Sequence, residues 1–403
     1  MDFELLILGS DINAYYMARC YHEEYGKKAY LIGKTAMKFT SYSKILNISI
    51  EPNIQDTKVF KSTLKEFYLN HKNKKILLIG SNDTYVRLII ENQEYLSKYF
   101  IFHKFSIDLL NTLLVKEKFY TKFEGVDIPK TYIYNAKEKL DYNIVDEIGF
   151  PLILKPSDGI KYHEHEFHNQ FKVYKIKNKE HLEDVLSKIK NSGYSDNLII
   201  QKFIDGDDSY LFDCVAYVDR NNKVKLMTFA EIGLQEHTPT GIGNATVVLN
   251  GYNRYGHTKE TIEKLKKAIE NSGYRGFCEF DLKYDAEDST FKVLEINPRQ
   301  ARCSYYLAFA GYNLVKYIVD DLIYERDLEY HFIDNLVCLS FVPISIIKKY
   351  IKDKNMVDTI KKLKKERKLV NPLNYKKDNL LKRKMWLILR NYNYIRKYRK
   401  NRW

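Results

Sequence analysis

Two carboxylates and an amide with the spacing of metal ligands lie within residues 277–299. Asp281 stands in one run of alternating apolar and polar residues, and Glu295 and Asn297 stand in a second run beyond a short polar turn. If the runs fold as a β-hairpin, Asp281 comes close to the other two side chains, which share one sheet face because they are two residues apart. Carboxylate and amide oxygens are hard ligands suited to Mg²⁺, which also binds nucleotide phosphates. The stretch therefore predicts a magnesium site, and a solvated edge hairpin is the alternative that spacing alone leaves open.

Two arginines follow the second run. Pro298 ends the strand, so we expect Arg299 beside the metal, where a guanidinium can bind a phosphate or a carboxylate. Arg302 begins the next segment and is a candidate for binding a carboxylate or phosphate of the substrate.

The composition narrows the class of protein. At 403 residues the chain is long enough for two or three domains. The sequence contains no run of about 18 apolar residues, so we expect no membrane span. The start of the chain reads as a β-strand and not as a signal peptide. Five scattered cysteines form no Cys-x-x-Cys pair, which favours a reduced, cytoplasmic protein. The net charge of +14 favours anionic partners such as a nucleotide, a nucleic acid, an anionic lipid or an anionic precursor.

The N-terminal pattern predicts a Rossmann-like parallel sheet. Residues 3–9 form an apolar strand, residues 13–25 have helical spacing, and residues 29–32 form the next strand. Residues 75–80 are a further buried strand, and Ser81–Asp83 caps the helix that follows. The first turn lacks the G-x-G-x-x-G pattern of dinucleotide sites, which argues against a nicotinamide-dependent dehydrogenase.

A lysine at the end of an apolar strand points to an anion site in the middle of the chain. Residues 106–119 have the spacing of a helix, and residues 150–154 are an apolar strand that Lys155 follows. Desolvation of an ammonium group is costly, so a lysine at this place usually has a partner, although a solvated strand end is the alternative.

The polar segment after this strand carries three histidines. His163, His165 and His168 alternate with acidic residues, a pattern that zinc sites also use. Because no cysteine or distant histidine partner is evident, we expect a solvated β-hairpin here and not a zinc site.

A strand, a hinge and an acidic turn follow at residues 198–208. Strands at 210–218 and 225–230 come next, joined by a polar turn. Residues 238–246 form a glycine-rich loop whose amides can bind an anion, although an ordinary connection is an equally good interpretation. Residues 258–271 have the spacing of an amphipathic helix.

The sequence Glu-Ile-Asn-Pro-Arg at residues 295–299 resembles the metal-binding signature of the ATP-grasp ligases. That resemblance implies ATP and Mg²⁺ as cofactors, with Mn²⁺ as the alternative metal. It also implies Asp281, Glu295 and Asn297 as the metal ligands, and Glu279, on the same strand face, is the second choice for the first ligand.

Two lysines match the nucleotide-binding lysines of this family. Residues 119–131 resemble the entry to the ATP-grasp fold, where a lysine starts a helix, so the resemblance implies Lys116, with Lys118 as the alternative. The family usually has Asp before this lysine, and Val115 stands there. Lys155 lies in a Leu-Lys-Pro sequence and matches the second lysine, which contacts α- and β-phosphate oxygens.

The hinge segment resembles the part of the family that binds adenine through backbone groups and ribose through a following acid. The resemblance implies Gln201, Lys202 and Ile204 at the base, and Asp208 at the ribose with Asp207 as second choice. The family often has Glu where Lys202 stands, so we expect backbone recognition to carry the contact there.

The implied fold class is α/β (α+β), with an ATP-grasp fold, a Rossmann-like parallel-sheet domain before it and a basic helical tail after it. We predict boundaries at 1–103, 104–330 and 331–403. The ATP-grasp domain then divides into residues 104–205 and 206–330.

The spacing of apolar and basic residues over 376–403 predicts a basic amphipathic helix. Both tryptophans of the chain, Trp386 and Trp403, lie here among many basic residues. The apolar stripe consists of Leu381, Met385, Ile388, Tyr392 and Ile395. Such a helix can lie on an anionic membrane surface, or it can dock on its own enzyme with a solvated basic face; the second arrangement is favoured.

Within the ATP-grasp proteins, the chain is most similar to carboxylate–amine ligases of the D-aspartate ligase type, on its length, its Glu-Ile-Asn-Pro-Arg-Gln sequence, its extended flap and its basic tail. This resemblance implies that ATP phosphorylates a carboxylate and that an amine attacks the acyl phosphate. Arg299 and Arg302 are the implied catalytic residues. The substrates would be a small acid such as D-aspartate and an amine on a UDP-linked cell-wall precursor.

Other classes of function stay open. One is an ATP-grasp ligase for a different acid and an amine or sugar-linked precursor, and another is a non-catalytic protein that binds a nucleotide or an anionic polymer. No recognised nucleic-acid module appears, so we expect no specific nucleic-acid partner. We expect a cytoplasmic protein whose tail can contact the inner membrane surface, and the oligomeric state is not predicted.

Overall fold

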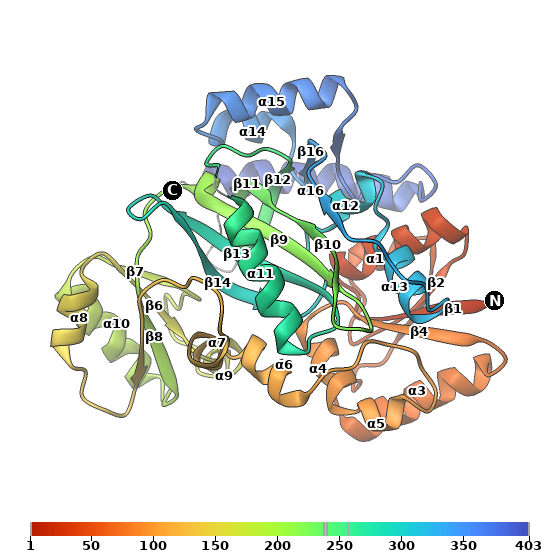
Figure 1. Ribbon diagram of the computed structural model, residues 1–403, viewed down its shortest axis with the longest axis horizontal. Coiled ribbons are helices and arrows are strands. Elements are labelled where there is room, and N and C mark those ends of the chain that lie inside the picture. Colours follow the sequence, from red (N-terminus) through yellow and green to blue (C-terminus); the bar gives the residue numbers. More distant parts are fainter. Residues whose placement is uncertain (1, 237, 239–240, 257, 402–403) are drawn as a thin grey trace.

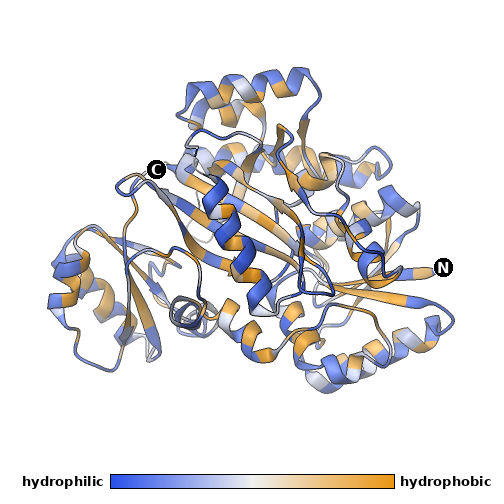
Figure 2. Cartoon of the chain, in the orientation of Figure 1, coloured by the Kyte–Doolittle hydropathy of each residue, from blue (hydrophilic) through white to orange (hydrophobic). Residues whose placement is uncertain are grey.

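Three β-sheets, formed one after another along the chain, make up the frame of the protein (Figure 1). The computed structural model describes residues 2–236, 238, 241–256 and 258–401. Apolar residues concentrate on the strands and on one side of most helices (Figure 2). The second sheet buries a core of its own, whereas the first and third sheets share one core. The mixed α/β architecture agrees with the fold class expected from the sequence.

The first sheet is four-stranded and parallel, in the order β3-β2-β1-β4. Its strands are β1 (Phe3–Leu8), β2 (Ala29–Gly33), β3 (Leu46–Ile50) and β4 (Lys75–Gly80). The helices of this part are α1 (Ile12–Tyr25), α2 (Lys38–Ser41), α3 (Thr57–His71), α4 (Asp83–Glu91) and α5 (Gln93–Leu96). The Asp11 side chain caps α1, Gly26 ends it in the left-handed conformation with φ of 67°, and Asn82 caps α4. The predicted Rossmann-like sheet is confirmed.

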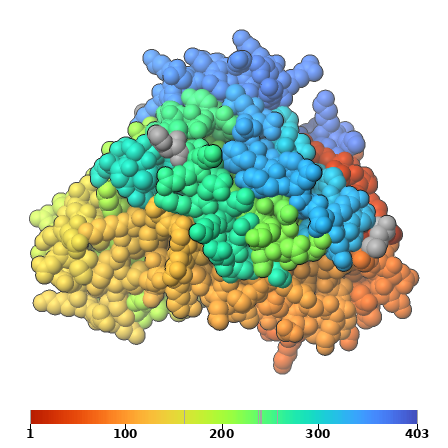
Figure 3. Space-filling model, in the orientation of Figure 1, coloured from red at the N-terminus to blue at the C-terminus, as the bar shows by residue number. Residues whose placement is uncertain are grey.

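The second sheet forms a lobe at one corner of the molecule, yellow at the left of Figure 3. Its antiparallel strands lie in the order β5-β8-β6-β7. They are β5 (Thr131–Asn135), β6 (Leu152–Pro156), β7 (Tyr174–Ile176) and β8 (Asn197–Lys202). The helices of the lobe are α8 (Tyr142–Ile148), α9 (Gly159–His163) and α10 (Lys179–Asn191).

The β-hairpin expected around the three histidines is wrong. Its first residues form the short helix α9, which begins where the Asp158 side chain accepts a hydrogen bond from the backbone N–H of Lys161. This turn places the Tyr162 ring in the core of the lobe, where its hydroxyl lies 2.9 Å from that of Tyr174. A solvated strand would leave that ring exposed, so burial of the tyrosine favours the helix.

The third sheet has nine strands and occupies the centre of the molecule (Figure 1). Its strands are β9 (Leu211–Val218), β10 (Val224–Thr228), β11 (Ala230–Gln235), β12 (Ala245–Asn250), β13 (Gly276–Asp285), β14 (Thr290–Asn297), β15 (His331–Ile333), β16 (Val337–Ser340) and β17 (Leu369–Val370). The 3₁₀-helix η1 (Asp208–Tyr210) precedes β9, and the helix α11 (Thr258–Ser272) precedes β13. Strands β15 to β17 come from residues 331–403 and join the same sheet as β9 to β14; the predicted domain boundaries stay a prediction.

The helix predicted over residues 106–119 is interrupted. Val115 has an extended backbone, with φ of −92° and ψ of 111°, between α6 (Ile107–Leu114) and α7 (Lys116–Lys122). Because of this break, Lys116 begins a helix of its own. The remaining helices are α12 (Tyr305–Phe309), α13 (Leu314–Leu322), α14 (Ile344–Tyr350), α15 (Lys354–Lys365) and α16 (Leu381–Lys400).

The tail helix α16 docks on the protein through the side opposite to its apolar stripe. Its buried residues are Arg383, Arg390, Tyr394 and Tyr398. The predicted stripe faces solvent instead, with Leu381 73% and Ile388 69% exposed, and only Ile395 is half-buried. The helix is docked, as favoured from the sequence, but the expectation of a wholly solvated basic face is wrong. Trp386 packs edge-on against the ring of Phe39, whereas Trp403 lies outside the described residues.

A buried carboxylate joins the tail to the first sheet. Asp378 accepts hydrogen bonds from Tyr15 Oη at 3.0 Å, Ser43 Oγ at 2.8 Å and the backbone N–H of Lys44 at 2.8 Å. Arg383 Nε lies 3.4 Å from the same carboxylate, and its guanidinium stacks 3.8 Å from the centre of the Tyr15 ring. Both charged side chains are shielded from solvent, so each depends on the other for compensation.

Replacing Asp378 by alanine should lower the free energy of unfolding by about 3 kcal/mol, because Arg383 then stays buried without its carboxylate. Guanidinium-induced unfolding, followed by tryptophan fluorescence, measures this change. The matched control is Asp358→Ala, which removes an exposed ion pair with Lys361 and should change stability by less than about 0.5 kcal/mol. Equal effects of the two substitutions would show that the buried pair does not tie the tail down.

Candidate active site

The predicted β-hairpin is present, and it gathers acidic side chains on one face of the third sheet. In the register of β13 and β14, Asp281 lies opposite Glu295 and Glu279 lies opposite Asn297. The register shifts after Asp281, so Leu294 is an extra residue in β14, and its carbonyl accepts a hydrogen bond from the hydroxyl of Tyr120. The four polar side chains therefore share one face, as expected from their spacing.

Burial makes this group of carboxylates electrostatically costly. Asn297 Nδ2 donates to Glu279 at 3.2 Å and to Asp281 at 3.1 Å. Burial, with the neighbouring carboxylates, raises the pKa of Asp281 well above its ordinary value, and burial with the charge of Asp213 does the same for the pKa of Glu279. A cation in this place would relieve both effects.

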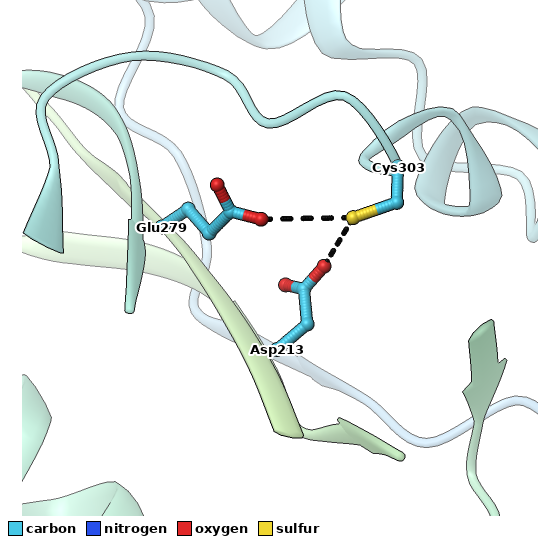
Figure 4. A group of neighbouring side chains, drawn as sticks. All are labelled: Asp213, Glu279 and Cys303. Atoms are coloured by element: carbon cyan, nitrogen blue, oxygen red, sulfur yellow. Dashed lines mark hydrogen bonds between the residues drawn. The ribbon is translucent and has the colours of Figure 1, made fainter. Parts of the chain in front are cut away.

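Asp213 and Cys303 extend the cluster, and sequence reasoning missed both of them. Asp213 lies on β9 directly opposite Asp281, and burial raises its pKa to about 7. The Cys303 thiol donates to Asp213 at 2.5 Å and lies 3.6 Å from Glu279 (Figure 4). Burial raises the pKa of Cys303, so the thiol keeps its proton and acts here as a hydrogen-bond donor.

The donor groups of the hairpin suit a hard divalent cation. Carboxylates of Asp281 and Glu295 face each other across the hairpin, and the amide of Asn297 lies beside them. That amide now directs its nitrogen at the acids, so a bound cation would take its oxygen instead. Among the described residues, Asp213, Glu279 and Cys303 are the three potential metal donors that lie within 4.8 Å of one another. The three histidines do not form such a group, which leaves the zinc alternative unsupported.

Lys116 supplies the positive charge that Glu295 needs. Its ammonium lies 2.5 Å from Glu295 Oε2, at the first residue of α7. The charge of Lys116 holds the pKa of Glu295 well below its ordinary range. Burial by itself would lower the pKa of Lys116, but the charge of Glu295 outweighs burial and raises that pKa to about 12. The structure therefore places Lys116 at the acidic cluster, and the alternative Lys118 does not pair with Glu295.

Lys155 lies at the inner end of the lobe, as a buried ammonium group. Its Nζ donates to Tyr120 Oη at 2.7 Å and to Gln201 Oε1 at 3.1 Å. Gln201 in turn donates to Thr131 Oγ1 at 2.7 Å. The oxygens of Tyr120 and Gln201 are both neutral, so they accept hydrogen bonds from the ammonium group of Lys155 but do not neutralise its charge. Such a cation is suited to bind a phosphate.

The predicted hinge residues follow directly after β8. The Lys202 side chain pairs with Asp285 at 3.3 Å and Glu287 at 2.5 Å at the turn of the hairpin. Its backbone N–H donates to the carbonyl of Lys130 at 2.9 Å, so this donor is already used within the protein. Ile204 is buried. Asp208 accepts hydrogen bonds from the backbone N–H and the side-chain amide of Gln235, at 3.0 and 2.7 Å.

The glycine-rich loop joins β11 to β12 beside this acid. Gln235 accepts a hydrogen bond from the backbone N–H of Gly243 at 2.8 Å, so one loop amide is already occupied by the protein. Pro239 and Thr240 of the predicted loop lie outside the described residues.

Lys283 is a further cation near the hinge that the sequence interpretation did not include. Its Nζ donates to the carbonyl of Gly206 at 3.1 Å and lies 5.3 Å from the centre of the Phe203 ring, and burial lowers its pKa. Lys283 shares the strand face of Asp281, two residues away, so the alternation that selected Asp281 could also have selected it.

The two arginines after the hairpin contact different parts of the chain. Arg299 Nε donates to Asp83 Oδ1 at 2.7 Å, in the first turn of α4, and another nitrogen donates to Asn297 Oδ1 at 3.1 Å. Arg302 donates to the hydroxyl of Tyr394 in α16 at 3.0 Å. Both arginines line one cavity of roughly 600 Å³ beside the acidic cluster.

Comparison with known proteins identifies the family. The profile of the family described as "Carbamoyl-phosphate synthase L chain, ATP binding domain" matches residues 117–319, half of the chain. A D-aspartate ligase of Enterococcus faecium (strain Aus0004) is 32% identical over 414 aligned positions, which cover 99% of this chain and 96% of that protein.

Solved structures share the fold. N5-carboxyaminoimidazole synthetase from Staphylococcus aureus, complexed with ADP, has a TM-score of 0.61 at 15% identity, covering 84% of this chain and 81% of that one. The biotin carboxylase domain of the 2-oxoglutarate carboxylase of Hydrogenobacter thermophilus, in complex with MgADP, has a TM-score of 0.59 at 16% identity, covering 83% and 72%.

These matches agree with the acidic β-hairpin, with Lys116 and Lys155 near it, and with the three-sheet fold. The family uses ATP together with Mg²⁺, and the donor groups of the hairpin fit that pair of cofactors. The chain therefore belongs to the ATP-grasp family, and it is an ATP-dependent carboxylate–amine ligase.

Proposed function

We propose that this ligase uses ATP to activate a carboxylate of D-aspartate and joins it to an amine of a UDP-linked cell-wall precursor peptide. The observation that carries this proposal is the 32% identity to a D-aspartate ligase over nearly the whole chain. ATP would pass its γ-phosphoryl group to the carboxylate, and the amine would displace phosphate from the acyl phosphate to form the amide.

The metal and phosphate roles fall to residues around the hairpin. Asp281, Glu295 and Asn297 would hold Mg²⁺, which supplies charge neutralisation to the transferring phosphoryl group when it is bound. Lys116 and Lys155 would bind phosphate oxygens. Lys116 forms an ion pair with Glu295 in this structure. When the metal and the nucleotide bind, its ammonium group would therefore leave the carboxylate and pair with a phosphate oxygen.

The remaining roles belong to the hinge and the two arginines. The segment from Gln201 to Ile204 would contact adenine. The carboxylate of Asp208 would accept hydrogen bonds from the ribose hydroxyls. Arg299 would stabilise the acyl phosphate, because its guanidinium lies between the acidic cluster and the cavity. Arg302 would bind the acid on the far side of that cavity.

Replacing Glu295 by glutamine should reduce ADP formation at least about 100-fold, because the substitution removes a metal ligand and the partner of Lys116. A coupled ADP-release assay measures the rate, and a thermal-shift titration checks that the variant still folds. The control is Asp288→Asn in the same hairpin, where an ion pair with Lys292 is distant from the cluster. Full activity of the Glu295 variant would contradict the metal assignment.

The substrate assignment is tested by Mg²⁺-dependent ADP release with a panel of D- and L-amino acids, each combined with UDP-linked precursor peptides. We expect release with D-aspartate and one acceptor, and weak release with L-aspartate or D-alanine. Release that requires a different acid or amine would keep the ligase and replace the substrate assignment.

We also propose that the enzyme acts in the cytoplasm, at the inner surface of the membrane. All five cysteines are free and buried, which fits a reducing compartment. Within the described residues, none of the helices is both long and apolar enough to span a membrane. The outer face of α16 supports peripheral binding, because its exposed apolar stripe is flanked by basic residues that complement anionic lipid. The exposed basic residues that remain for this face are Lys382, Lys384, Arg396, Arg399 and Lys400, because Lys397 pairs with Glu236 in the cavity.

The double substitution Met385→Ser and Ile388→Ser should reduce binding to anionic liposomes at least about fivefold without loss of ligase activity, because it removes exposed apolar surface that a membrane would bury. Liposome sedimentation at low and high salt measures the effect. Leu69→Ser, an exposed leucine on α3, is the control and should not change binding. Binding that survives the double substitution, or a dimer that the substitution disrupts, would contradict the membrane assignment.

A further inference from the structure

The cavity beside the acidic cluster has the tail helix α16 as one wall. Four parts of the chain line it: the start of α1 with α2, the connection between β11 and β12, the segment after the hairpin, and α16. Its lining includes Asp11, Glu236, Arg302, Arg390, Tyr394 and Lys397. Arg299 lines the cavity and also contacts Asn297, so a ligand bound there would reach the predicted metal site.

Two guanidinium groups meet on one phenol oxygen in this wall. Tyr394 Oη accepts hydrogen bonds from Arg302 at 3.0 Å and from Arg390 at 3.1 Å. Arg390 also donates to the carbonyl of Phe341 at 3.2 Å, and only 8% of its surface is exposed. These neutral oxygens orient both guanidinium groups but carry no charge to neutralise them, and the acid that lies near Arg302 is Glu236, at 3.6 Å.

The carboxylates of the cavity do not balance its cations. Asp11 caps α1 and accepts hydrogen bonds from Ser81 and Asn82, and within the described residues it forms no ion pair with the cations of α16 or with Arg302. Glu236 lies 2.6 Å from Lys397 and 3.6 Å from Arg302, and it is the acid that the described part of the cavity offers to these groups.

Three cations of this wall, Arg302, Arg390 and Lys397, therefore share one carboxylate, which leaves two positive charges in excess. Burial, together with the nearby Arg302, lowers the pKa of Arg390, as expected for a cation that lacks an anionic partner. The group is therefore prepared for an anion.

We propose that α16 completes the binding site of the acid substrate, and that Arg302, Arg390 and Lys397 hold a second anionic group of that acid. The reacting carboxylate then lies toward Arg299 and the acidic cluster. The enzyme selects a dicarboxylic acid over a monocarboxylic acid of the same length, because only the former neutralises this wall. This inference rests on the proposed function, and it assigns to the tail helix a part in substrate specificity.

A matched pair of simple acids tests the site without relying on turnover. Succinate is a dicarboxylate and butyrate is its monocarboxylate counterpart of equal chain length, so their difference reports the second anionic group. Succinate should raise the melting temperature of the full-length protein, and butyrate at the same concentration should not. Equal effects of the two acids on the wild-type protein would overturn the proposal.

Two substitutions in the wall should act in opposite directions. Lys397→Gln removes a cation at the half-exposed edge of the cavity, and it should weaken succinate binding roughly tenfold or more. Glu236→Gln removes the carboxylate that competes for Arg302 and Lys397, and it should tighten binding severalfold. Lys384→Gln removes one charge of the same helix outside the cavity and should leave binding unchanged. Weaker binding by both wall variants would mean that the ion pairs only hold α16 in place, and it would overturn the proposal.

Steady-state kinetics with D-aspartate then separates this site from the proposed function. Lys397→Gln should raise the KM for the acid at least about tenfold, with little change in kcat or in the KM for the acceptor. A change confined to the KM of the acceptor would assign the cations to a phosphate of the nucleotide-linked precursor and overturn the assignment to the acid. If no D-aspartate ligation occurs but succinate binding behaves as expected, the anion site stands and the proposed substrate fails.

Discussion

The close packing of several carboxylates on three neighbouring strands is the electrostatic constraint on which the active-site region depends. Asp213 on β9 and Glu279, Asp281 and Glu295 on the hairpin lie together, and Asp213 and Glu279 are buried. A group of this kind is stable only if protons, hydrogen-bond donors or cations compensate it. The thiol of Cys303 supplies one such donor.

The need for positive charge explains how distant parts of the chain converge on the hairpin. Lys116 reaches Glu295 because the chain breaks at Val115 and a new helix starts there. Arg299 reaches back between the hairpin and the first sheet, where Asp83 holds it. The cations that compensate these carboxylates are those to which the proposed function assigns the phosphates of ATP and the acyl phosphate.

The tail helix shows how tertiary contacts can reverse the usual orientation of an amphipathic helix. Arg383 and Arg390 turn inward because carbonyl groups, aromatic rings and Asp378 receive them there. The apolar stripe consequently points to solvent. One helix thus presents a cationic inner face to the cavity and an apolar, basic-flanked outer face to its surroundings, and the two faces can be altered independently.

Local pattern in the sequence was enough to predict the parallel N-terminal sheet, the acidic hairpin and the strand that ends in Lys155, because the period of a strand and the polarity of a turn are set by neighbouring residues. The structure brings Lys116 and Arg299 to the hairpin, but their roles stay predictions and their partners did not follow from spacing. Only the tertiary structure decided the contacts of Asp213, Cys303 and Lys283. It also decided that α9 is helical and which face of α16 is buried. Those features depend on which groups from distant segments can pair with a buried charge or bury a ring, and no periodicity within one segment encodes that choice.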